Sequence, residues 1–77
     1  MDLDLRADLN AEDDDGLNWA LLADAARADQ IRPGAVVRAG RERYWSWVRI
    51  VRVDDDGQVH FRQLSASEAQ AGLAEAG

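Results

Sequence analysis

Arginines and aromatic side chains gather between Arg38 and Arg62, and these residue types are well suited to binding at a surface. A guanidinium pairs with carboxylates and stacks on aromatic rings. Tryptophan, tyrosine and arginine also tend to dominate the binding energy of protein interfaces. We therefore expect partner contacts on one surface that contains Arg41, Arg43, Tyr44, Trp45, Arg49 and Arg52. Whether Arg49 or Arg52 takes part depends on the presence of a bulge in the strand.

A second interpretation assigns these residues to structure alone. Trp45 and Trp47 would then be core residues, and the arginines would solvate the sheet or pair with Asp24, Asp29 and the N-terminal acids. The alternation in Trp47–Val53 places Arg49 and Arg52 on opposite faces of a regular strand. One of the two arginines must then lie against apolar neighbours unless a bulge intervenes.

The single histidine, His60, offers little for catalysis or metal binding. A catalytic triad needs a nucleophile, a base and an acid that converge in a cleft, and no spacing in the sequence brings Ser46 to His60. A metal site would need further ligands near the histidine, and the chain has no cysteine. We expect His60 to pack across strands on the exposed face of a sheet, and we predict no catalytic residue, metal or cofactor.

Two acidic runs, Asp13–Asp15 and Asp54–Asp56, each precede a glycine. A calcium loop of the EF-hand type needs an acid at its first position, but the spacing from Gly16 or Gly57 places Ala11 or Arg52 there. We interpret the first run as a helix cap and solvated linker, and the second as residues that favour a turn.

The length and charge of the chain restrict the class of protein. Its 77 residues allow one small domain, and the formal net charge is −6. Residues 1–30 hold nine acids against two arginines, whereas residues 31–64 hold seven arginines against four acids. The absence of lysine and cysteine removes Schiff-base, phosphate-loop and thiol chemistry. The use of arginine without lysine, together with 14 alanines, is typical of a GC-rich bacterial genome. The sequence has no apolar stretch of 18 residues, so we expect a cytoplasmic protein.

The first half of the chain predicts a flexible segment followed by a helix. Residues 1–12 are short and highly charged, so we expect a flexible acidic segment there. Leu17, Leu21, Ala25 and Ala28 recur at helical spacing, which predicts a helix over about residues 16–29. Pro33-Gly34 then favours a turn of type II.

The second half predicts strands and a final helix. Residues 35–39, 44–53 and 58–64 have the composition of strands, and Asp56-Gly57 favours a hairpin turn between the last two. Ser65 and Glu68 form a capping box that opens a helix from Ala66 to about Glu75. The predicted fold class is α+β: one small domain over residues 13–77 with an N-terminal helix packed on a three-stranded antiparallel meander and a short C-terminal helix.

The segment 33–64 resembles the small SH3-like barrels of the Tudor and KOW type. The resemblance rests on Pro33-Gly34-Ala35-Val36-Val37-Arg38-Ala39-Gly40, on Tyr44-Trp45-Ser46-Trp47 and on the Asp56-Gly57 turn. It implies a partial barrel and a module that binds a peptide, a modified side chain or RNA.

Three functions from different classes follow from these patterns. The first is a protein-interaction or regulatory module, monomeric or homodimeric, without enzymatic activity or membrane contact. The second is a nucleic-acid-binding module that uses the basic middle of the chain, against which the net charge of −6 argues. The third is an acidic mimic of nucleic acid, of the kind found among inhibitors and antitoxins. We favour the first of these, with a protein partner.

Overall fold

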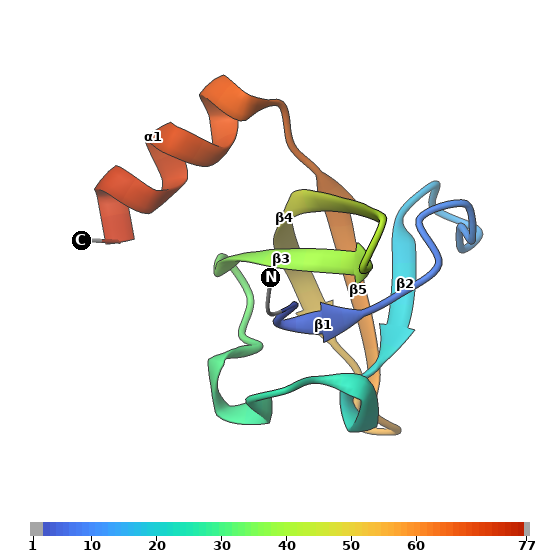
Figure 1. The fold of residues 1–77 in the computed structure, drawn as a ribbon. Coiled ribbons are helices and arrows are strands. Elements are labelled where there is room, and N and C mark those ends of the chain that lie inside the picture. The colour runs from blue at the N-terminus through green and yellow to red at the C-terminus, as the bar shows by residue number, and fades with distance from the viewer. Residues whose placement is uncertain (1–2, 77) are drawn as a thin grey trace.

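The structure, a computed structural model, describes residues 3–76 as a curled five-stranded sheet followed by one α-helix (Figure 1). The sheet order is β1-β3-β4-β5-β2, and every neighbouring pair is antiparallel except β1 and β3, which are parallel. The elements are β1 (Leu5–Arg6), β2 (Asn18–Leu21), β3 (Val36–Arg41), β4 (Tyr44–Val53), β5 (Gln58–Gln63) and α1 (Ala66–Ala76), with short 3-10 turns at Leu22–Asp24 and Ala28–Gln30.

The centre of the sheet lies where the sequence predicts strands. β3, β4 and β5 pair in order, and Gly57 adopts a φ of 87° in the turn between β4 and β5. The register of β4 and β5 shifts between Ile50 and Arg52. This bulge is the irregularity that the two arginines of β4 require, because it changes the face on which Arg52 lies.

The predicted fold class is wrong, because the N-terminal helix does not form and the sheet has five strands instead of three. Residues 18–21 form β2, which pairs with β5 and alternates between buried and exposed side chains. Without β2, strand β5 would be an open edge beside Val59 and Phe61. Tertiary pairing with this edge outweighs the helical spacing of Leu17 and Leu21.

Residues 3–9, within the segment 1–12 that was expected to be flexible, complete the barrel-like curl, while Met1 and Asp2 of that segment lie outside the described residues. Leu5, Ala7 and Leu9 are buried, and Leu5 pairs with Ala39 of β3 on one side. On its other side Leu5 forms an isolated bridge with Ala25, just after β2. The two edges of the sheet are therefore tied together through the segment that follows β2, which curls the sheet into a half-barrel.

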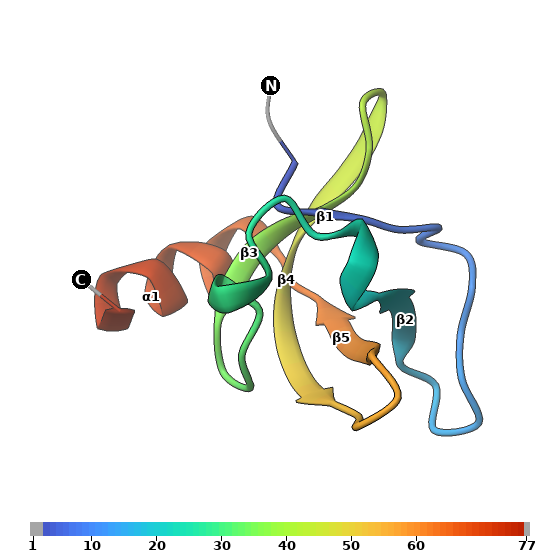
Figure 2. The same cartoon turned by 90° about the horizontal axis from the view of Figure 1, so that it is seen from below.

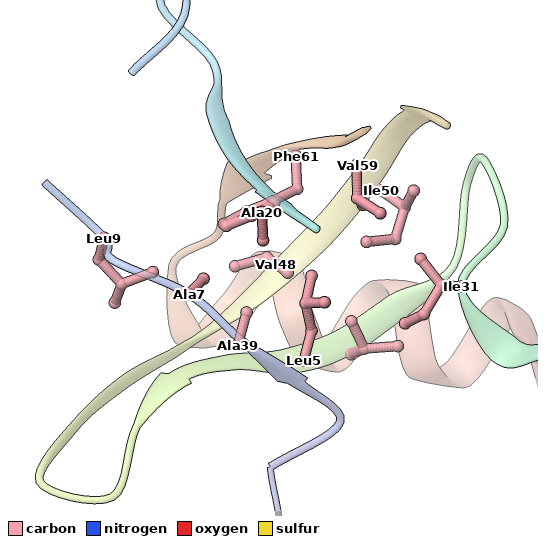
Figure 3. Close-up of a cluster of buried hydrophobic side chains, with 11 residues drawn as sticks. Leu5, Ala7, Leu9, Ala20, Ile31, Ala39, Val48, Ile50, Val59 and Phe61 are labelled. Carbon is pink, nitrogen blue, oxygen red and sulfur yellow. The ribbon is translucent and has the colours of Figure 1, made fainter. Parts of the chain in front are cut away.

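The core fills the concave side of this half-barrel (Figure 3). Phe61, Leu5, Ile50, Val48 and Val59 are the largest side chains that are fully buried. All five strands contribute to the cluster, and Ile31 joins it from the loop before β3. The side chains of β4 alternate between the two sides of the sheet. The residue between Val48 and Ile50, and every second residue from it toward the β3–β4 hairpin, therefore point to the opposite, convex side.

The C-terminal helix begins as predicted, with a capping box in which Glu68 N donates to Ser65 Oγ and Ser65 N donates to Glu68 Oε1. Its buried positions, Ala69 and Gly72, are small, and Gly72 lies close to the side chains of Val36 and Arg49 on the sheet. The largest apolar residue of the helix, Leu73, is instead exposed. No helix in the described part of the chain reaches the length and apolar character needed to cross a membrane.

Candidate functional site

The convex side of β3 and β4 carries an aromatic pair flanked by arginines. Trp45 and Trp47 are both partly buried, and their rings meet edge to face with centroids 5.9 Å apart at 78°. Neither residue belongs to the core cluster. The Arg38 guanidinium carbon lies 5.8 Å from the Trp47 ring centroid. We call Arg38, Trp45, Trp47 and Arg49 the Arg/Trp face.

The register of the hairpin explains why these side chains meet. Arg38 lies directly opposite Trp47, and Gly40 lies directly opposite Trp45. Asp4 holds Arg38 in place. The Oδ2 atom of Asp4 is 3.6 Å from Arg38 Nε, and it accepts a hydrogen bond from the backbone N–H of Arg38. Arg49 Nη1 donates to the Gly34 carbonyl at 3.3 Å. The Arg/Trp face is thus held by contacts at both of its ends.

The hairpin between β3 and β4 extends beyond the rest of the sheet (Figure 2). Three of the predicted binding residues lie at its tip: Arg41 and Arg43 line an open hollow of about 700 Å³, and Tyr44 is 62% exposed. Arg6 also lines the hollow, but so do the acidic residues Asp8, Asp24 and Glu42. Because the formal charges of these side chains cancel, the hollow has no preference for an anion.

The structure separates the six predicted residues into three groups. Arg41, Arg43 and Tyr44 lie at the hairpin tip, and Trp45 and Arg49 lie on the convex side of the sheet. Arg52 belongs elsewhere, since its guanidinium pairs with Asp15 at 3.5 Å and with Asp54 at 3.2 Å. The sequence reasoning missed Arg38 and Trp47 as surface residues. Counting back across the Glu42–Arg43 turn would have placed them opposite each other.

The sole histidine lies in a buried cluster rather than on an exposed surface, which corrects the sequence-based expectation. His60 is only 3% exposed. Its Nδ1 atom is 2.6 Å from Asp13 Oδ2, and its Nε2 atom is 2.8 Å from Asp54 Oδ2. Both ring nitrogens can donate only when the ring is a doubly protonated imidazolium. The two carboxylates are therefore placed to accept hydrogen bonds from a charged ring.

This geometry shifts the pKa of all three groups. Burial alone would lower the pKa of His60, but hydrogen bonds to Asp13 and Asp54 outweigh burial and raise it above 6.5. Burial would likewise raise the pKa of Asp13, but hydrogen bonds from Leu17 N–H, His60 and Asp15 N–H lower it. The hydrogen bond from His60 is the main cause of the lowered pKa of Asp54.

The cluster is poorly arranged for catalysis or for holding a metal. Both nitrogens of His60 contact carboxylates, so neither is free to accept a proton from a substrate. Ser46 is six residues along β4 from Arg52, the pairing partner of His60, which is about 20 Å in a strand. Within residues 3–76, no group of three potential ligand side chains is placed to hold a metal.

We expect stability to pass through a maximum between about pH 4 and 6.5. His60 has a raised pKa in the folded state, so its contribution is complete below 6.5 and is lost as pH rises through the folded value. Asp13 and Asp54 have lowered pKa values, so their contributions are complete above about 3.9 and are lost at lower pH. Urea unfolding between pH 3 and 9 measures this profile, and a His60→Gln control should abolish the alkaline slope. An alkaline slope that persists in the control would contradict the assignment.

Comparisons of the chain with protein-family models, with curated proteins and with solved structures gave no match. The half-barrel is loosely SH3-like in shape, while membership of that class stays a prediction.

Proposed function

We propose that this chain is a non-catalytic interaction module that binds a protein partner through the Arg/Trp face. The observation that carries the proposal is that Trp45 and Trp47 pack against each other outside the core, on the convex side of the sheet. A small domain gains most from placing its largest rings inside the core. Two indoles that lie outside the core and stay partly exposed therefore favour a role at a surface.

The composition and rigidity of the Arg/Trp face support a protein partner. Tryptophan and arginine are enriched at the positions that contribute most to protein interfaces. The two rings contact each other edge to face, and Arg38 lies over Trp47. These contacts restrict the motion of the three side chains before binding. A surface that is already ordered loses less conformational entropy when it binds.

The charge of the molecule favours a protein over a nucleic acid. The net charge of −6 opposes the long-range attraction that draws proteins to polyanions. Locally, however, Arg38 and Arg49 flank the two rings, and Arg62 lies directly opposite Arg49 in β5. A partner segment that carries a carboxylate beside an apolar side chain matches this arrangement of charges and rings.

The test compares binding by the wild-type chain and by a Trp47→Ala variant. The partner is first isolated from lysate of the source cells and purified, and its Kd for each chain is then measured. We expect the variant to bind at least ~30-fold more weakly, which corresponds to about 2 kcal/mol for a residue at the centre of an interface. A Leu21→Ala variant is the control, because Leu21 is 46% exposed on β2, at the far edge of the sheet.

Thermal unfolding of both variants separates loss of binding from loss of fold. Equal affinity of wild type and Trp47→Ala, with both chains folded, would place the binding site elsewhere. Capture that disappears after nuclease treatment or at high salt would instead support the nucleic-acid alternative and contradict the proposal.

A further inference from the structure

We propose that His60 is a proton-controlled latch that joins the segment Glu12–Leu17 to the turn after β4, and that loss of its proton opens the Asp54 side of the latch. The three side chains come from distant parts of the sequence. Asp13 precedes β2, Asp54 follows β4, and His60 lies in β5. Among the residues that the structure describes, the ring is the one side chain that hydrogen-bonds with both carboxylates.

The protein positions each carboxylate independently of the ring. Asp13 Oδ1 accepts hydrogen bonds from the backbone N–H groups of Asp15, at 2.8 Å, and Leu17, at 2.9 Å. Asp54 Oδ1 accepts one from Arg52 Nε at 3.2 Å. These contacts leave the Oδ2 atom of each carboxylate directed at the ring. The latch is therefore preorganised for a ring that donates from both sides.

A neutral ring cannot satisfy this arrangement. Neutral imidazole carries one N–H, so its second nitrogen would present a lone pair to a carboxylate oxygen less than 3 Å away. One of the two contacts must then open or admit water. Proton loss consequently changes the structure at this point and does more than remove a charge.

The relative exposure of the two carboxylates indicates which contact opens. The side chain of Asp13 is 15% exposed, whereas that of Asp54 is 37% exposed. Water can replace the ring at Asp54 more readily than at Asp13, which two backbone N–H groups also hold in place. The neutral ring should therefore keep its proton on Nδ1, facing Asp13, and release Asp54.

The other charged groups around the ring are consistent with this direction of opening. Arg52 lies opposite His60 on β4, and its positive charge disfavours the imidazolium. Arg52 also pairs with Asp15 from the N-terminal segment and with Asp54 from the turn. When His60 loses its proton, Asp54 keeps Arg52 as a partner. β2 places Trp19, an uncharged residue, opposite His60.

The consequence is a local loosening of the turn rather than unfolding. Gly57 in this turn accepts a hydrogen bond from Leu22 N, and the β5 ladder continues past His60 in both directions. The segment before β2 keeps a second anchor, because Asn18 Nδ2 donates to the carbonyls of Leu9 and Ala11. Opening should therefore be confined to residues 54–57.

Nitrogen-15 NMR of the ring tests the latch directly, since the chain has one histidine. As pH rises from 5, we expect both ring nitrogens to stay protonated past pH 6.5 and the neutral form then to carry its proton on Nδ1. Amide exchange at residues 55–57, corrected for its intrinsic rise with pH, should accelerate through the same midpoint, while exchange at Ala20 and Val59 should not. A neutral ring at pH 6, or an Nε2–H tautomer at high pH, would overturn the proposal.

Two conservative variants separate the latch from a general effect of pH. Asp54→Asn should lower the midpoint of the ring titration and make exchange in the turn insensitive to that titration. Asp13→Asn should also lower the midpoint but should remove the preference for the Nδ1–H tautomer. Equal tautomer ratios in the wild type and in Asp13→Asn would contradict the assigned roles. The proposal does not depend on the Arg/Trp face, and these measurements need no partner.

Discussion

Replacing Leu5 by alanine should remove a large share of the stability of the protein, although Leu5 belongs to a strand of only two residues. Leu5 is 0% exposed and belongs to the core, and its backbone pairs with Ala39 on one side and with Ala25 on the other. Truncation of a buried leucine to alanine costs about 2–5 kcal/mol. At about 0.05–0.15 kcal/mol per residue, a chain of this length has a total stability of about 4–12 kcal/mol.

The matched control for Leu5→Ala is Leu21→Ala, which removes the same atoms from a side chain that is 46% exposed. We expect the control to change the free energy of unfolding by at most about 0.5 kcal/mol. Urea denaturation followed by tryptophan fluorescence measures both variants. The helix predicted from the sequence would have made Leu21 a core residue and Leu5 dispensable. The opposite order of the two effects would therefore argue for that helix and against β1 and β2.

The parts of the fold that the sequence predicts well are those with local signals. β4 combines aromatic and β-branched residues over ten positions, and the Asp56-Gly57 turn directs β5 back along it. The helix α1 begins at a capping box that lies within four consecutive residues. In each case the stabilising contacts join residues that are close in the sequence.

The parts that sequence reasoning misses depend on distant contacts. Leu17, Leu21 and Ala25 fit a helical period, but β2 forms because β5, some forty residues later, offers an edge to pair with. β1 is fixed by Ala39 and Ala25, neither of which a pattern in residues 1–12 reveals. The same holds for the latch, in which Asp13 and His60 are 47 positions apart. Short segments carry too little local preference to decide between such alternatives.

The candidate binding surface could be predicted from the sequence only in part. Arg38 and Trp47 are joined by hairpin register, which the strand pattern and the turn length together determine. Arg52 was expected at the binding surface from the arginine content of this segment and the alternation of Trp47–Val53. Its acidic partners Asp15 and Asp54 become visible only when the N-terminal segment is brought to the turn after β4. The sequence pattern therefore predicted the hairpin, but it did not show which of its arginines form ion pairs with acidic side chains.

Replacing Gly40 by alanine should distort the hairpin that carries the Arg/Trp face. Gly40 has a φ of 135°, and a Cβ atom there would press on the Tyr44 carbonyl oxygen and lie 2.7 Å from Trp45 Cα. The strained backbone costs about 1–3 kcal/mol and overpacking about 1–3 kcal/mol more. We therefore expect a loss of about 2–6 kcal/mol in the free energy of unfolding, measured by urea denaturation.

Gly34→Ala separates the two causes, because Gly34 also has a positive φ, 89°, but has no atom within 4 Å of an added Cβ. Its cost should be limited to the backbone, about 1–2 kcal/mol. Gly40 also accepts a hydrogen bond from Ala7 N at 3.1 Å, so displacement of this residue disturbs β1, β3 and β4 together. If Gly40→Ala were no more destabilising than Gly34→Ala, then β3 and β4 would be farther apart at Trp45 than the structure shows. In that case the close packing of β3 on β4, which places Arg38 opposite Trp47 in the Arg/Trp face, would lose its support.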